Sequence, residues 1–203
     1  MKLESLIAEL DCADAGRSAR AVGILMRRKD PSCVPLLLPL SVSPNFTAAC
    51  SALAVLPVFG DNRMICHFLL ERLRSRDAGV RERAAFALKD LPQRRAFPAL
   101  MKSATRDRNA SVRAWSLHAL SKLMWNNSKR MAACRRIFLK ATRSPSPQIR
   151  HAGFEGLFSL PGDRLKRVLE RALRDRDLTI SKASAPDWAE RLAAKKPITS
   201  QKP

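Results

Sequence analysis

The sequence predicts an all-helical chain in which about five antiparallel helix pairs stack into an α-α superhelix, or solenoid. Two observations carry this prediction. One helical motif recurs along the chain, and short turns rich in Pro, Gly, Asn and Asp separate segments whose apolar residues follow a helical period. Because a single helix pair cannot bury its apolar face alone, each pair has to stack on its neighbours.

The recurring motif is seen in three segments that share one pattern. VRERAAFALKDL begins at Val80, VRAWSLHALSKL begins 32 residues later at Val112, and IRHAGFEGLFSL begins 37 residues after that at Ile149. Each has a β-branched residue followed by Arg, and then apolar residues spaced to lie on one helical face. A fourth segment, residues 46–56, keeps the apolar stripe but lacks the Arg. These segments are predicted to be the second helices of successive pairs.

The first helix of each pair precedes its second helix along the chain. We expect the first helices at residues 31–41, 62–75, 94–106, 127–143 and 163–176. Pro35 and Pro98 lie near the start of their helices, where a missing backbone N–H is tolerated. As one continuous solenoid domain, the chain is predicted to comprise capping helices over 1–29, repeats over 30–177, and a cap with a flexible basic tail over 178–203.

Over residues 30–180 the sequence resembles the HEAT repeat in its short bacterial form. The resemblance rests on Ala-x-Pro-x-Leu in a first helix, Asp in the turn, and Val-Arg or Ile-Arg opening the second helix. It implies a ladder of charge-assisted hydrogen bonds between turn Asp and helix Arg residues. The residues it implies are Asp77, Arg81, Asp107, Arg113 and Arg150. The ladder is expected to be interrupted at Ser146-Pro147 and in the 46–56 copy, which lacks the Arg.

The charge of the chain is large and unevenly distributed. The 203 residues include 38 Lys and Arg against 18 Asp and Glu, a formal net charge of +20. Residues 1–61 hold six basic and six acidic side chains, whereas residues 62–203 hold 32 basic and 12 acidic ones. Between Asp107 and Glu155 there is no acidic residue and there are ten basic ones. Such an excess favours an anionic partner.

Basic residues recur at helical spacing on the outer faces of the first helices. These outer rows are Arg95, Lys102 and Arg106; Lys129, Arg136, Lys140 and Arg143; and Arg164, Arg167, Arg171 and Arg174. Stacking is predicted to bring the rows side by side, where they repel one another unless phosphates relieve the charge. The favoured partner is therefore nucleic acid, bound through its phosphates, or an acidic protein. The alternative is a set of ordinary solvated helix faces.

The second helices are predicted to line a concave surface that offers a competing site. Its candidates are Arg83, Lys89, Trp115, His118, Lys122, Trp125 and His151. Aromatic side chains among basic ones are suited to stacking on nucleobases. The alternative is that the tryptophans pack between repeats.

No catalytic or metal-binding pattern is found, and no cofactor is expected. The three histidines lack the spacing of a triad or a metal site, and the glycines do not cluster. Certain alkylpurine DNA glycosylases are built from similar repeats and use Trp, Asp and Arg. Here no carboxylate stands one helical turn beyond Trp115 or Trp125. Bilin lyases also carry such repeats, but nothing in this sequence marks a chromophore pocket.

Two further expectations concern the location and partners of the protein. The acidic residues of the N-terminal segment are unlike a signal peptide, which favours the cytoplasm. Residues 31–60 carry no charge, but their five prolines predict two short helices joined by a turn rather than a membrane span. This charge-free segment, or the concave surface, is an alternative docking site for a protein, in which case the chain is an interaction scaffold.

Overall fold

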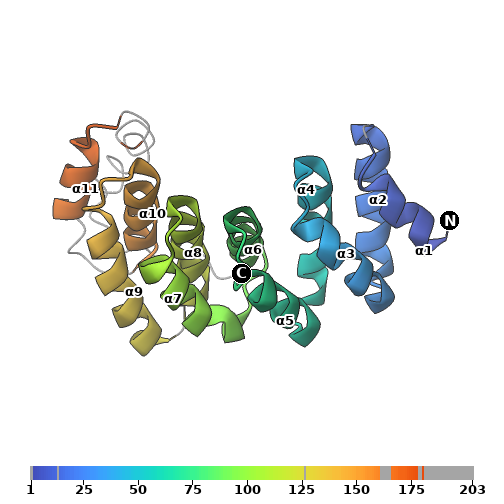
Figure 1. Cartoon of the computed structure of the whole chain (residues 1–203), viewed down its shortest axis with the longest axis horizontal. Helices are drawn as coiled ribbons and strands as arrows, with labels where there is room; N and C mark the ends of the chain where they lie inside the picture. Colours follow the sequence, from blue (N-terminus) through green and yellow to red (C-terminus); the bar gives the residue numbers. More distant parts are fainter. Residues whose placement is uncertain (1, 13, 126, 161–165, 178–179, 181–203) are drawn as a thin grey trace. The chain divides into compact units, whose positions relative to one another are not determined.

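The computed structural model describes residues 2–12, 14–125, 127–160, 166–177 and 180 (Figure 1). Every regular element within these residues is a helix, which confirms the all-helical prediction. The chain divides into two compact units, Met1–Ala119 and Leu120–Pro203. The predicted capping helices belong to the first unit, and residues 181–203 of the predicted basic tail lie outside the described residues.

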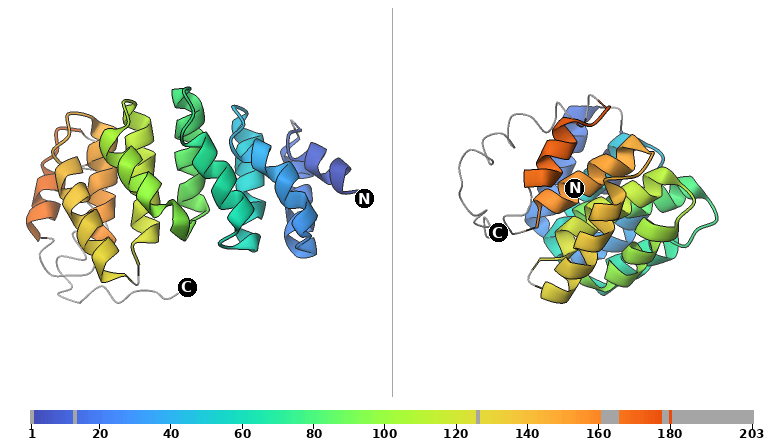
Figure 2. Two further views of the ribbon diagram at one scale, coloured as in Figure 1. Left: turned by 60° about the horizontal axis from the view of Figure 1, so that its bottom comes forward. Right: turned by 90° about the vertical axis from the view of Figure 1, so that its left-hand side faces the viewer.

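The first unit is a succession of helices joined by short turns (Figures 1 and 2). In chain order its elements are α1 (Leu3–Glu9), α2 (Ala15–Arg28), η1 (Pro31–Cys33), α3 (Val34–Ser41), α4 (Phe46–Val55), η2 (Leu56–Phe59), α5 (Arg63–Arg72), α6 (Ala78–Asp90), η3 (Arg94–Ala96) and α7 (Phe97–Arg106). Helix α8 (Ala110–Leu123) begins in this unit and ends in the second. Helix α3 packs against α4, and α5 packs against α6, as expected for paired helices.

Local chemistry explains where these helices begin. Asp14, Asn45, Asn62 and Asp77 precede α2, α4, α5 and α6, and each side chain accepts a hydrogen bond from a backbone N–H of the first turn. Helices α3 and α7 instead follow a short 3-10 turn and carry Pro35 and Pro98 in their first turn, where no N–H donor is needed.

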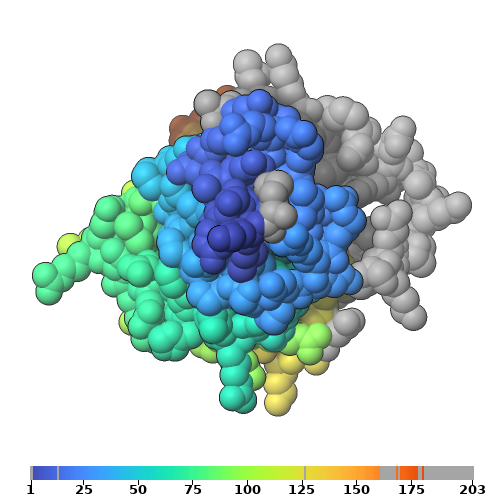
Figure 3. Space-filling view, turned by 90° about the vertical axis from the view of Figure 1, so that its right-hand side faces the viewer, coloured from blue at the N-terminus to red at the C-terminus, as the bar shows by residue number. Residues whose placement is uncertain are grey.

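The apolar stripes of the repeated motif form the core. The two leucines that close each motif are buried in all three copies: Leu88 and Leu91, Leu120 and Leu123, and Leu157 and Leu160. At the N-terminal end, α1 packs directly on α2 and buries Leu6 and Leu10 (Figure 3). Helices α1 and α2 thus cover the N-terminal end of the first unit.

The charge-free segment forms two short helices, α3 and α4, as its prolines predict. Leu37 and Leu53 are buried between these helices and their neighbours, whereas Phe46 remains 73% exposed. Within the described residues, every helix is too short or too polar to reach across a bilayer.

The second unit contains α9 (Ser128–Ala141), α10 (Pro147–Phe158) and α11 (Lys166–Leu173). Helices α9 and α10 lie unusually close, because two glycines of α10 face α9. A Cβ atom built on Gly153 would lie 2.8 Å from the Ala141 Cβ atom and 2.9 Å from the Thr142 backbone nitrogen, and one built on Gly156 would lie 2.5 Å from the Phe138 ring. Phe138 is fully buried, so its ring has no free space to move into.

The Gly153→Ala substitution is expected to destabilise the second unit. Overpacking of a filled core costs about 1–3 kcal/mol, and the better helix propensity of Ala returns up to about 1 kcal/mol of this. Urea unfolding followed by circular dichroism measures the difference. Gly23→Ala is the matched control, because a Cβ atom there would make only an ordinary 3.5 Å contact with Arg27, and it should be neutral or stabilising. Equal stability of the Gly153→Ala chain and the natural chain would contradict the close approach.

Candidate anion-binding groove

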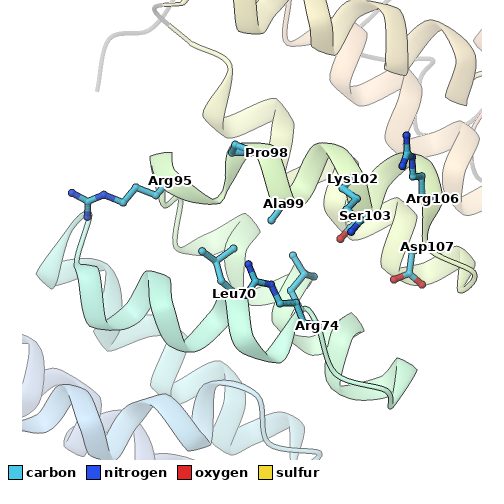
Figure 4. A pocket seen from close by; sticks show the side chains of 10 residues that line it. Leu70, Arg74, Arg95, Pro98, Ala99, Lys102, Ser103, Arg106 and Asp107 are labelled. Carbon is cyan, nitrogen blue, oxygen red and sulfur yellow. The ribbon is translucent and has the colours of Figure 1, made fainter.

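A groove opens on the surface of the first unit between the C-terminal part of α5 and the length of α7 (Figure 4). Its volume is about 660 Å³. Leu70, Leu73 and Arg74 lie on the α5 side, and Arg95, Pro98, Ala99, Lys102, Ser103, Arg106 and Asp107 lie on the α7 side. We call this feature the basic groove.

Four cations line the basic groove, and all four are exposed: Arg74, Arg95, Lys102 and Arg106. Buried Leu73 and half-buried Leu70 and Ala99 supply an apolar lining beside them. None of the four cations forms an ion pair with a carboxylate of the described residues. The groove therefore combines a hollow surface with uncompensated positive charge.

The one carboxylate that lines the groove is already engaged. Both oxygens of Asp107 accept hydrogen bonds from Arg81, at 2.8 Å from Nε and 3.0 Å from Nη2. Burial alone would raise the pKa of Asp107, but the hydrogen bonds from Arg81 and from the Asn109 backbone outweigh it and hold the pKa below its ordinary value. Because Arg81 neutralises Asp107, this carboxylate does little to offset the four groove cations.

Sequence reasoning found three of the four groove cations. Arg95, Lys102 and Arg106 form one of the predicted outer rows. Arg74 was missed because no outer row was assigned to the first helix expected at 62–75. In the structure that helix ends at Arg72, and Arg74 lies in the turn after it. The available signal was the dense basic run from Arg72 to Arg76.

The outer row of α9 is also exposed. Lys129, Arg136, Lys140 and Arg143 are all at the surface, while Cys134 and Phe138 on the opposite face are fully buried. Arg171 in α11 and Arg174 directly after it are exposed, whereas Arg164 and the side chain of Arg167 lie outside the described residues. That the rows of the two units join into one surface stays a prediction.

Two residues of the predicted concave surface, Lys89 and Trp115, are engaged in contacts with Phe86 within the first unit. The rings of Phe86 and Trp115 meet edge to face with centroids 4.8 Å apart, and Lys89 Nζ lies 4.6 Å and 5.3 Å from the two centroids. Lys89 Nζ is also 3.2 Å from Asp90. Trp115 thus packs against Phe86 of the preceding second helix, as the alternative of packing between repeats requires for this tryptophan.

The other concave candidates have different surroundings. Arg83 Nε donates a 2.7 Å hydrogen bond to the Val42 carbonyl oxygen at the end of α3, so it links two repeats. The ring centroid of His118 lies 5.3 Å from that of Trp115, and His151 Nε2 lies 3.8 Å from a Glu155 oxygen. Lys122 and Trp125 are exposed.

Two of the three arginines of the implied ladder pair with a carboxylate of the following repeat, whereas Arg113 donates to the backbone carbonyl oxygens of Asp107 and Arg108 and has no carboxylate partner in the described residues. Arg81 reaches forward to Asp107, and Arg150 reaches forward to Asp175 with both contacts at 2.8 Å. Asp77 has another role: it accepts a hydrogen bond from the Gly79 backbone at the start of α6. Asp107 stands six residues before Arg113 of its own repeat, whereas Asp77 stands four residues before Arg81. Asp175 was missed, although Asp175-Arg176-Asp177 parallels Asp107-Arg108-Asn109.

Alternating first and second helices, tied by arginine–carboxylate pairs between repeats, define an α-solenoid repeat protein. Residues 67–134 match the family model described as HEAT repeats. No curated protein matches the sequence.

Several solved structures share the fold. The complex of CpcE and CpcF of phycocyanin lyase from Nostoc sp. PCC7120 aligns with a TM-score of 0.56 and 20% identity over 91% of this chain and 74% of that one. Kap95p, from a structure of its binding to RanGDP, aligns with a TM-score of 0.59 and 14% identity over 98% of this chain and 28% of that one. A designed armadillo repeat protein in complex with the peptide (KR)4 aligns with a TM-score of 0.50 and 12% identity over 91% of this chain and 97% of that one. At these identities the likeness shows the solenoid fold.

Proposed function

We propose that this chain is a non-enzymatic binding protein of the cytoplasm that holds a nucleic-acid strand by its phosphates, without a small-molecule cofactor. The observation that carries the proposal is the charge of the basic groove. Four exposed cations line one hollow, and the only carboxylate in its lining is neutralised by Arg81. An ordinary solvated helix face mixes both signs of charge instead.

Phosphate binding follows from the electrostatics of the groove. Cations held close together repel one another, and a phosphate backbone relieves this repulsion while releasing the counterions condensed on the nucleic acid. Arg74, Arg95 and Arg106 offer planar donor groups that fit phosphate oxygens, and Lys102 adds a point charge. The proposed contacts go to the backbone, and contacts of that kind position a strand without reading its sequence.

A second candidate function, a scaffold for another protein, is supported by a different observation. Phe46 at the start of α4 is 73% exposed and Leu36 in α3 is 41% exposed, and both lie in the charge-free segment. Large exposed apolar side chains favour a protein partner. An interaction of this kind would persist at high salt and after nuclease treatment, whereas phosphate binding would not.

The test is the salt dependence of binding to a random-sequence duplex and a random single strand. If the four groove cations contact four phosphates of a duplex, a plot of log K against log salt concentration should have a slope of about −3.6 or steeper. A duplex whose phosphates are replaced by uncharged methylphosphonates is the control and should not bind. Binding that is insensitive to salt, or no binding of either strand at low salt, would rule out the phosphate mechanism.

A further inference from the structure

Three arginines occupy the same place in three successive repeats and are oriented in the same way. Each uses Nη1 to bind two backbone carbonyl oxygens of the turn before its helix. Arg81 binds Ser75 and Arg76 at 3.0 Å each, Arg113 binds Asp107 at 2.6 Å and Arg108 at 3.0 Å, and Arg150 binds Ser144 at 3.1 Å and Pro145 at 2.9 Å. These contacts hold each guanidinium plane in a fixed direction.

The free edge of the guanidinium, made by Nε and Nη2, distinguishes Arg113 from the other two. In Arg81 and Arg150 this edge binds both oxygens of one carboxylate. In the described part of the chain, Nε and Nη2 of Arg113 have neither a hydrogen-bond partner nor an ion-pair partner. Arg113 is half-buried, and its Nε and Nη2 atoms are not fully enclosed by the described residues. Arg113 therefore presents an oriented, unfilled donor pair.

We infer that the Nε and Nη2 edge of Arg113 binds one phosphate group of the nucleic-acid strand. Two oxygens of a phosphate match this edge as two carboxylate oxygens do, and the resulting pair of parallel hydrogen bonds is charge-assisted. Since the Nη1 contacts already fix the guanidinium, little side-chain freedom is lost on binding. The inference rests on the proposed function, because it assigns one phosphate of the bound strand to this arginine.

The position of Arg113 connects this phosphate with the basic groove. Asp107 lines the groove, and its backbone carbonyl oxygen accepts a hydrogen bond from Arg113 Nη1. Arg113 is therefore anchored at the end of α7, where the groove reaches Arg106. The Asp107 carboxylate is not available to fill the Arg113 edge, because both its oxygens are bound by Arg81. Exposed Arg106 and Arg108 flank Asp107 in the chain and add positive charge on this side.

The first experiment is the Arg113→Lys substitution, which keeps the charge and removes the planar donor pair. Duplex affinity is expected to fall about tenfold or more, since hydrogen bonds to charged groups contribute about 1.5–3 kcal/mol, while the salt slope should change little. Arg76→Lys is the matched control. Arg76 is an exposed arginine in the turn before Arg81, as Arg108 is in the turn before Arg113, and it belongs neither to the groove nor to the proposed contact, so its substitution should change affinity less than about twofold.

A second measurement does not depend on a variant that folds. The arginine Nε–H signals of the natural chain are followed by NMR during titration with inorganic phosphate, and the Arg113 signal is assigned through its covalent connection to the Arg113 backbone resonances of the natural chain. A saturable shift of this signal, larger than that caused by acetate, supports the inference. An equal or larger shift with acetate would overturn it in favour of a carboxylate partner.

The two measurements separate the inference from the proposed function. If the natural chain binds strands but the Arg113 signal does not respond to phosphate and Arg113→Lys keeps full affinity, the Arg113 contact is overturned and the groove remains. If the natural chain binds no strand, both the proposed function and the strand contact at Arg113 are overturned, whatever the response to free phosphate.

Discussion

Replacing Lys102 and Arg106 together with Glu is expected to lower affinity for a random-sequence duplex by about 100-fold or more at low salt. Each side chain is exposed in the basic groove and contributes one proposed phosphate contact, and a hydrogen bond to a charged group contributes about 1.5–3 kcal/mol. The loss of two contacts should also make the salt slope less steep by about 1.8. Fluorescence anisotropy at several salt concentrations measures both quantities.

The matched control for this variant is the pair Arg20→Glu and Arg27→Glu in α2. These two arginines are exposed, belong to the same unit and change the net charge by the same amount, but they do not line the groove. They should lower affinity only a few-fold, through the overall field of the protein. If both double variants lose affinity equally, the chain attracts polyanions by its net charge and the groove is not the site.

Asp175→Ala is expected to cause the largest loss of stability among single substitutions of the ion pairs between repeats. The side chains of Arg150 and Asp175 are 7% and 6% exposed, and removal of the acid leaves a buried guanidinium without a counter-charge. Breaking a buried pair in this way costs about 3–5 kcal/mol. Denaturant unfolding measures the cost. Asp61→Ala, at an exposed position, is the control and should change stability by less than about 0.5 kcal/mol.

The stabilisation by this pair also depends on pH. Hydrogen bonds from Arg150 hold the pKa of Asp175 below the ordinary value of 3.8, despite the opposing effect of burial. Because the folded-state pKa lies below the unfolded one, the contribution is fully present above the unfolded pKa and is lost as pH falls through the folded pKa. The difference in stability between the natural chain and Asp175→Ala should therefore be constant near neutral pH and shrink below about pH 4. A difference that grows in acid would contradict the assigned pairing.

Much of the fold could be predicted because it depends on short-range sequence patterns. The motifs that begin at Val80, Val112 and Ile149 became α6, α8 and α10, since apolar residues at helical spacing must all face one core. The exposure of the outer row of α9 was predicted from the same helical spacing. Its cations alternate with Cys134 and Phe138 at helical spacing, so burial of those two residues leaves the cations exposed.

The partners of individual side chains could not be predicted in this way. The resemblance implied that Asp77 takes part in the ladder, but the structure places Asp107 on Arg81 and Asp175 on Arg150, 26 and 25 residues further along the chain. Lys89, a candidate ligand of the concave surface, lies over the rings of Phe86 and Trp115. Each of these contacts joins residues of different helices, whose separation depends on how the helices pack.

By itself, therefore, the sequence determined the helices, their buried faces and the excess of positive charge, because each of these follows from residue type and helical spacing. Only the tertiary structure decided that Arg74 lies across a groove from Lys102, that Asp107 is neutralised by Arg81, and that no carboxylate of the described residues pairs with Arg113. The physical reason is that charge compensation depends on distances of a few ångströms between repeats, and helical periodicity within one repeat does not specify those distances.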